Sequence, residues 1–186
     1  MAMVDNLAKL AAGADGVSDV EALMGKTVPG TSKTGRDCMN DAVNVLRENM
    51  QLKKAAQLKG TLAKYVHHNG KVGVLVAFDG PVSADLGSAI CMQIAAMNPL
   101  AVTRDKVDPA LVETERKVAV DQAAASGKPK EIAEKMAVGK LNKWYSQVVL
   151  LEQPFVRDDK QTVEQVLKSA GKTTVVDFVR MAVGEI

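Results

Sequence analysis

Four helix-start and helix-stop signals between residues 108 and 129 restrict the fold more than any other feature. Asp108 and Pro109 can begin a helix, because aspartate is a preferred N-cap and proline is tolerated at the first helical position. Gly127 ends that helix near residue 125, and Pro129 begins another that runs to about residue 145. So short a linker forces the helices to fold back on each other. The sequence predicts an antiparallel helical hairpin over residues 109–145.

The second helix of this hairpin carries small and apolar residues along one side, which would let the two helices approach closely. These residues are Ala133, Met136, Ala137, Leu141 and Trp144. We interpret Trp144, the only tryptophan, as part of the hairpin core, with contact to a partner as the alternative.

Strand patterns lie on either side of the hairpin. Lys71–Phe78 (KVGVLVAF) is rich in valine and almost continuously apolar, which is typical of a buried strand. The Asn69-Gly70 pair before it is a strong β-hairpin signal and joins it to an extended segment over Thr61–His67. Residues 50–58 are also expected to be extended, and Thr173–Val183 alternates as a strand does.

The remaining segments have helical periodicity. Helices are expected over residues 3–12, 19–24 and 37–49, from Ser83 to Ala96, and from Thr162 to near Gly171. The predicted class is α+β, with small antiparallel sheets, helices and one protruding helical hairpin.

A weak internal repeat suggests two related subdomains. Val43–Lys54 resembles Val166–Arg180, and VDNLAKLAAG near the N-terminus resembles SAICMQIAAMN, which begins at Ser88. The second copy is preceded by the strand KVGVLVAF, whereas the first copy begins at its helix. We therefore expect an incomplete N-terminal core subdomain over residues 1–60 and a C-terminal core subdomain over residues 61–186 that includes the hairpin.

Composition argues against nucleic-acid and membrane partners. The net charge is only +2, and 3% of residues are aromatic, so neither a basic stripe nor a base-stacking surface is visible. No apolar run is long enough to span a membrane, and the N-terminus does not resemble a targeting peptide. Cys38 and Cys91 lie far apart, which is typical of free thiols in a reducing compartment. These features predict a cytoplasmic protein.

The sequence also lacks the constellations that covalent chemistry requires. It shows no nucleophile–base pair, no cluster with metal-ligand spacing and no phosphate-binding glycine loop. We expect no catalytic residue, metal or cofactor, and we expect a protein that works by contacting another macromolecule.

Several motifs in the same order resemble the elongation factor Ts family over essentially the whole chain. They are YVHHNGKVGVLV (65–76), IAAMNP (94–99), SGKPKEIAEKM (126–136), QPFV (153–156), and FVR (178–180) with Gly184-Glu185. The resemblance implies two pseudo-repeated subdomains, each a small three-stranded sheet with helices, and a helical arm on the second. It also implies a nucleotide-exchange factor that binds elongation factor Tu, disturbs its magnesium and phosphate site, and speeds GDP release without a cofactor.

The chain departs from the family pattern in four places. The family's N-terminal ubiquitin-associated-like domain and its Thr-Asp-Phe-Val segment are not present, which suggests a truncated core. Gln93 stands where a histidine is common, and Arg47 replaces a usual glycine in a helix-to-strand turn.

The resemblance assigns partner contacts to four residues: Leu46, His67, Val156 and Arg157. Three of the four have a structural alternative. Leu46 could be core, His67 could be a hairpin-end histidine facing solvent, and Phe155 and Val156 could pack on the sheet; for Phe155 we favour packing. A metal site at His67 and His68 is not expected, because adjacent strand residues face opposite sides.

Two functions are compatible with these features. The first is a guanine-nucleotide exchange factor core for elongation factor Tu. The second is a docking or oligomerisation module that binds elongation factor Tu, or itself, without driving exchange. Because the arm pairs two copies in some family members, a homodimer through the hairpin also remains open.

Overall fold

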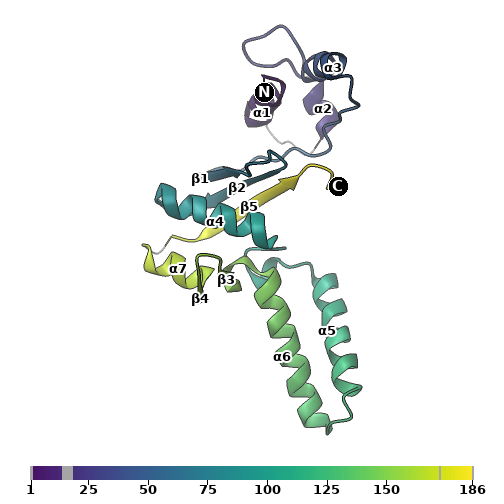
Figure 1. Cartoon of the computed structure of the whole chain (residues 1–186), viewed down its shortest axis with the longest axis vertical. Helices are drawn as coiled ribbons and strands as arrows, with labels where there is room; N and C mark the ends of the chain where they lie inside the picture. Colours follow the sequence, from purple (N-terminus) through teal and green to yellow (C-terminus); the bar gives the residue numbers. More distant parts are fainter. Residues whose placement is uncertain (1, 14–18, 172, 186) are drawn as a thin grey trace. The chain divides into compact units, whose positions relative to one another are not determined.

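The computed structural model describes residues 2–13, 19–171 and 173–185, and it divides into two compact units (Figure 1). One unit comprises residues 1–57 together with 184–186, and the other comprises residues 58–183. Helices and small antiparallel sheets make up the fold, so the predicted α+β class is confirmed.

In the described residues, the first unit contains the helices α1 (Ala2–Gly13), α2 (Val20–Met24) and α3 (Gly35–Leu46). α3 begins with a capping box, in which the Thr34 hydroxyl accepts from the backbone N–H of Asp37 and the Asp37 carboxylate accepts from that of Thr34. The buried core of this unit consists of Leu7, Leu10, Leu23, Met24, Val28, Cys38 and Met39.

The extended segment expected over residues 50–58 forms no strand, and this part of the prediction is wrong. Among the described residues of the first unit, the only β pairing is an isolated bridge between Thr27 and Thr34. Met50, Leu52 and Ala55 instead pack against the helical core, with exposed residues between them. These partly buried side chains thus belong to an irregular segment lying along helices. Both named sheets belong to the second unit.

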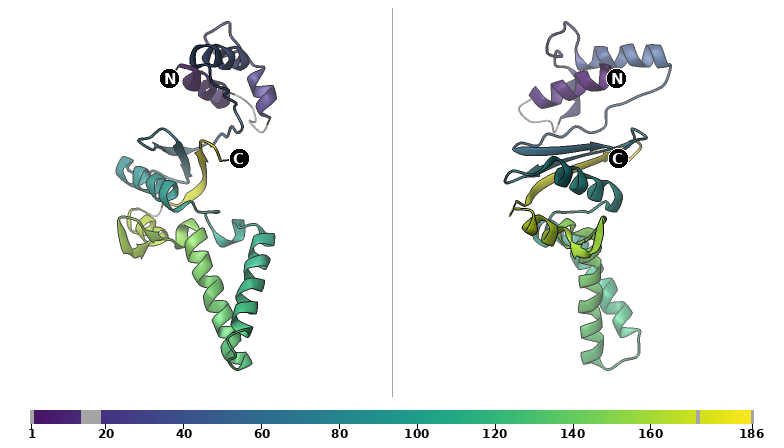
Figure 2. Two further views of the ribbon diagram at one scale, coloured as in Figure 1. Left: turned by 45° about the vertical axis from the view of Figure 1, so that its right-hand side comes forward. Right: turned by 60° about the vertical axis from the view of Figure 1, so that its left-hand side comes forward.

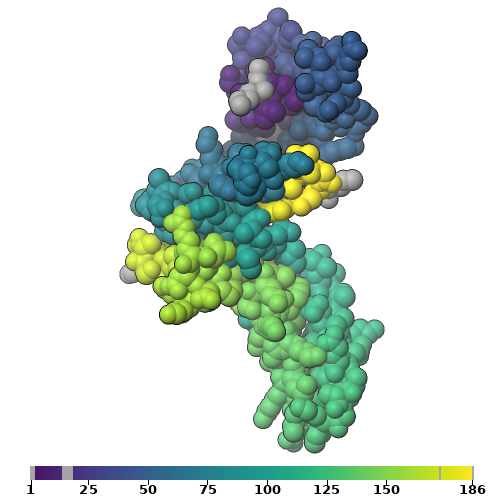
Figure 3. All heavy atoms as spheres, in the orientation of Figure 1, coloured from purple at the N-terminus to yellow at the C-terminus, as the bar shows by residue number. Residues whose placement is uncertain are grey.

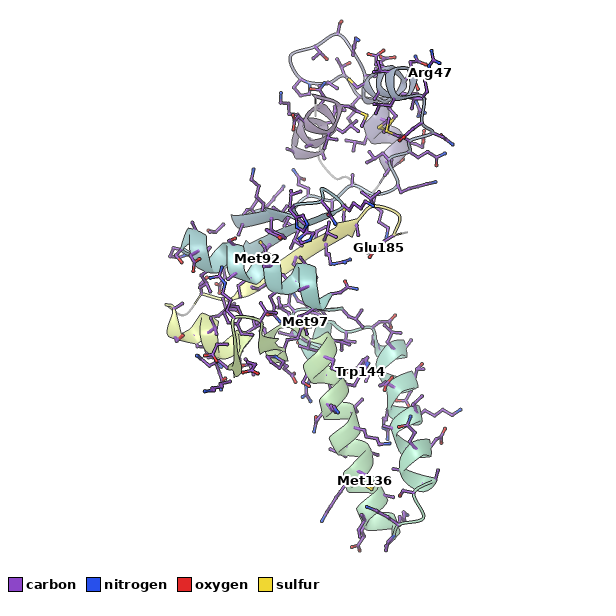
Figure 4. All side chains as sticks on the ribbon, in the orientation of Figure 1. Arg47, Met92, Met97, Met136, Trp144 and Glu185 are labelled. Carbon is purple, nitrogen blue, oxygen red and sulfur yellow. The ribbon has the colours of Figure 1, made fainter. Side chains whose placement is uncertain are left out.

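Arg47 ends α3 in the left-handed region, with φ 57° and ψ 32°, and it is labelled in Figure 4. Its backbone N–H donates to the Val43 carbonyl at 2.7 Å, which closes the helix. A left-handed conformation costs an L-residue roughly 1–2 kcal/mol, which explains why glycine would suit this position.

Replacing Arg47 by glycine is expected to stabilise the first unit by about 0.5–1 kcal/mol, because the strain is relieved at a smaller cost in unfolded-state entropy. Amide exchange of α3 in the two proteins measures the difference. Asn98→Gly is the matched control: Asn98 caps α4 (Ala84–Met97) at φ 45°, and asparagine tolerates that conformation better. An equal gain at both positions would contradict strain at Arg47.

The second unit is built on a three-stranded antiparallel sheet in the order β1 (Thr61–Val66), β2 (Val72–Phe78) and β5 (Val175–Ala182). The predicted hairpin turn joins β1 to β2: Gly70 adopts φ +69°, and the His67 N–H donates to the Val72 carbonyl at 2.8 Å. The strand expected at Lys71–Phe78 is therefore confirmed, as is the final strand.

α4 packs on β1 and β2 and supplies much of the core (Figure 2). Ser83 caps its N-terminus as predicted. Gly87 permits a close approach to the sheet, since a Cβ atom at this position would lie 2.8 Å from the Cβ of Ala63. Cys91 is fully buried on this helix, and burial raises the pKa of its thiol to about 11.

The predicted helical hairpin consists of α5 (Pro109–Ala124) and α6 (Lys130–Val148), and α6 extends three residues beyond the expected end. The hairpin projects from the rest of the second unit (Figure 3). Ala119 and Ala123 on α5 are buried against Ala137 on α6, so small side chains bring the helices together as expected. The Gly127 turn adopts φ +67°.

Short elements connect the hairpin to the sheet. The 3-10 turn η1 (Arg104–Lys106) precedes α5, and η2 (Leu150–Glu152) follows α6. A two-stranded sheet of β3 (Pro154–Phe155) and β4 (Asp158–Thr162) then leads to α7 (Val163–Ser169), which Thr162 caps as predicted.

Candidate partner-binding site

A short turn at residues 153–157, here called the knob, presents the QPFV motif. Phe155 is buried in the core of the second unit, whereas the neighbouring Pro154 and Val156 are exposed. The interpretation of Phe155 as a packing residue is confirmed. Val156 is 47% exposed, so the alternative that it packs on the sheet is excluded.

Gln93, a fully buried residue of α4, holds the knob in place. Its side-chain amide donates to Oε1 of Gln153 at 3.0 Å and to the Pro154 carbonyl at 3.1 Å. Its Oε1 accepts from the backbone N–H of Val156 at 2.8 Å. One side chain therefore binds the knob at three positions that lie at least 60 residues away in sequence.

Gln153 completes this polar network inside the core. Gln153 is fully buried, and its Nε2 donates to the Gln147 carbonyl at 2.7 Å. The backbone carbonyl of Gln153 accepts from the Val163 N–H at 3.0 Å. Buried amides stabilise a unique arrangement only when their donors and acceptors are bonded, as they are here. The network consequently fixes the backbone from which Val156 projects.

Arg157 is anchored to the same helix. Its Nη1 lies 3.0 Å from Oδ2 of Asp85, in the first turn of α4, and the two side chains are 42% and 82% exposed. An ion pair this exposed contributes little to stability. Its effect is to orient Arg157, whose guanidinium retains donors that can reach a partner.

His67 lies just past the end of β1, in the turn before β2, and is half-buried. Its Nδ1 is 2.9 Å from the hydroxyl of Tyr65, which fixes the ring and leaves Nε2 as the second polar atom. The rings of His67 and His68 have centroids 4.2 Å apart. The expectation that they face opposite sides is wrong, because both residues follow the strand and so do not alternate as strand residues do.

Leu46, the last residue of α3, is 59% exposed, and Val45 beside it is 81% exposed. The alternative that Leu46 is core is therefore excluded. Leu46 belongs to the first unit, while His67, Val156 and Arg157 belong to the second. Within the second unit, α4 anchors both Val156 and Arg157, and His67 stands separately at the β1–β2 turn.

Sequence reasoning missed the role of Gln93, which it singled out only as a departure from a family pattern. A signal was present: an uncharged polar residue within the apolar run SAICMQIAAM must find hydrogen-bond partners if it is buried. Its partners could not be identified, because they lie some sixty residues later in a different element.

The described residues contain no group of three or more His, Cys, Asp and Glu side chains positioned to hold a metal ion. Within the same part of the chain, none of the helices combines the length and the hydropathy that crossing a membrane requires.

Trp144, at the end of the hairpin that adjoins the rest of the unit (Figure 4), is half-buried and packs on a cluster of Ala101, Val107 and Val149.

Comparison with known proteins identifies the family. A family model described as elongation factor TS matches residues 1–185. The chain is 40% identical over 200 residues to elongation factor Ts of Sinorhizobium fredii, a match that covers 98% of this chain and 64% of the relative. It is 42% identical over 190 residues to elongation factor Ts of Hyphomonas neptunium, a match that covers 98% of this chain and 62% of that relative. The chain thus spans less than two thirds of the length of these relatives. It belongs to the elongation factor Ts family of translation elongation factors.

Proposed function

We propose that the chain is a guanine-nucleotide exchange factor that binds elongation factor Tu in the cytoplasm and promotes release of GDP. The observation that carries the proposal is the knob, where an exposed valine projects from a backbone held by a fully bonded buried network. An exposed apolar side chain on a rigid backbone is suited to a protein interface, because little ordering is needed when a partner binds.

The mechanism that we propose is thermodynamic linkage. A protein that binds the nucleotide-free form of its partner more tightly than the GDP-bound form weakens GDP binding by the same factor. No bond is broken, and no side chain of this chain acts as an acid, a base or a nucleophile. Each contact instead biases the partner toward the conformation that holds GDP weakly.

We assign the contacts to Leu46, His67, Val156 and Arg157, and we propose that the two units correspond to core subdomains at residues 1–60 and 61–186. Leu46 and Val156 would supply apolar contacts, and their exposures of 59% and 47% leave surface to bury. His67 and Arg157 would supply polar ones, each oriented by a neighbouring side chain.

The alternative function is a docking or oligomerisation module that binds elongation factor Tu, or a second copy of itself, without driving exchange. The hairpin supports it, because α5 and α6 expose large apolar side chains along their length: Leu111, Val118, Val120, Ile132 and Val138. If the chain is an oligomerisation module, the hairpin pairs two copies of it.

Replacing Val156 by aspartate tests the knob as a contact. Placing a charge in an apolar contact is expected to weaken binding to elongation factor Tu about tenfold or more, or about 1.4 kcal/mol. Titration calorimetry measures the affinity. Val176→Asp is the matched control, since Val176 on β5 is 46% exposed against 47% for Val156. Equal losses in the two variants would exclude the knob as a specific contact.

A further inference from the structure

The hairpin is joined to the rest of the second unit at a base formed by the segments before α5 and after α6. The backbone pairs in a parallel bridge between Ala101 and Val149, in which the Leu150 N–H donates to the Ala101 carbonyl at 2.9 Å. An apolar cluster around Ala101, Val107 and Val149 fills the space between the segments. These contacts hold the ends of the helices together, but neither is a directional side-chain interaction.

One arginine, Arg104, makes directional side-chain interactions at this base. Arg104, in η1, donates from Nε and Nη2 to the two carboxylate oxygens of Glu152, at 2.5 and 2.6 Å. Its Nη1 donates to Oδ1 of Asn142 at 3.0 Å, and its guanidinium carbon lies 4.3 Å from the centroid of the Tyr145 ring. A single planar group therefore contacts two positions on α6 and one in η2.

This arrangement differs from an ordinary surface ion pair. Isolated exposed pairs contribute little, whereas a bidentate arginine–carboxylate pair within a network has a defined geometry. The guanidinium plane is fixed on one edge by Glu152, on another by Asn142, and on one face by Tyr145. Hydrogen bonding to Glu152 raises the pKa of Arg104, whose guanidinium is charged at every physiological pH.

The distal part of the hairpin has no comparable fastening. There the helices meet through the small side chains of Ala119, Ala123 and Ala137, with one side-chain bond from Lys140 to Gln122 at 2.7 Å. Any change of angle at the base is carried along the helices to the Gly127 turn. The direction of the whole hairpin consequently depends on the contacts at its base.

We propose that Arg104 is a positioning residue that sets the direction in which the hairpin leaves the second unit, and thereby where the hairpin meets a partner protein. The part concerning the partner rests on the proposed function. The part concerning direction does not, because it follows from the contacts that Arg104 makes with α6 and η2.

Spin-label distances test the direction. Cysteines replace Lys128 at the hairpin tip and Lys160 on β4, both exposed, while the native Cys38 and Cys91 are buried. Arg104→Met, which keeps an apolar stem but removes the guanidinium, is expected to broaden the distance distribution. Arg104→Lys should also broaden it, because an ammonium cannot form the planar fork. Arg116→Met is the control, since Arg116 pairs only with Glu113 on its own helix in the structure described.

Affinity for elongation factor Tu is measured on the same variants. Both Arg104 variants are expected to bind about tenfold more weakly, because a mobile hairpin must be ordered on binding. Circular dichroism melting confirms that each variant is folded, and the emission of Trp144 reports on the base without a label.

The two measurements separate the two claims. A distance distribution in Arg104→Met as narrow as in the unaltered chain would overturn the positioning role. No binding of elongation factor Tu by the unaltered chain would instead reject the proposed function and leave the distance result standing. A broadened distribution with unchanged affinity would show that Arg104 sets the hairpin's direction but that the partner does not use it, which overturns the second part of the proposal.

Discussion

Replacing Gln93 by leucine is expected to destabilise the second unit by about 3 kcal/mol and to weaken binding of elongation factor Tu. Leucine has a similar size but no polar atom, so the Val156 N–H, the Pro154 carbonyl and the Gln153 amide oxygen all lose a partner. An unpaired buried group costs about 1–3 kcal/mol, and movement of the knob into water recovers part of that cost. Urea unfolding measures the stability, and calorimetry measures the binding.

The effect on binding should exceed the effect of destabilisation alone. At temperatures where Gln93→Leu remains fully folded, the released knob no longer holds Val156 in one position, so affinity should still fall. Gln51→Leu is the control, because Gln51 is exposed and surface substitutions usually change stability by less than about 0.5 kcal/mol. If Gln93→Leu bound as tightly as the unaltered chain, the knob's anchoring would be irrelevant to recognition.

Glycine-to-alanine substitutions at two helical positions are expected to change stability in opposite directions. At Gly87 a Cβ atom would lie 2.8 Å from Ala63, so Gly87→Ala forces α4 away from β1 and should cost about 1–3 kcal/mol. At Gly139, in α6, a Cβ atom meets nothing within 4 Å, and alanine should stabilise the helix by about 0.8–1 kcal/mol.

Thermal unfolding followed by circular dichroism compares the two variants with the unaltered chain. Each serves as the other's control, since the chemical change and the helical context are the same. A stabilising Gly87→Ala would mean that the close contact between α4 and the sheet is absent from the folded protein.

The sequence predicted the elements whose signals are local. Asp108, Pro109, Gly127 and Pro129 defined the helical hairpin, because caps and turns depend on a few adjacent residues. The Asn69-Gly70 turn and the valine-rich strand after it were equally local. Burial of Phe155 followed from its place in an apolar, extended motif.

The failures depended on residues distant in sequence. An extended segment was expected at residues 50–58, but a strand needs a neighbour, and the structure places Met50 and Leu52 against helices instead. Leu46 could not be assigned to core or surface, because this depended on which side of α3 the other two helices would cover. The hydrogen bonds of Gln93 and Arg104 span 38 to 63 residues, beyond the reach of any local pattern.

Release of GDP from elongation factor Tu tests the central claim most directly. Elongation factor Tu is loaded with a fluorescent GDP and mixed in a stopped-flow instrument with this chain and an excess of unlabelled GDP. The exchange proposal predicts that the release rate rises with the concentration of the chain and reaches a plateau. A release rate that stays at its spontaneous value, while calorimetry still detects binding, would contradict the proposal and leave a docking module.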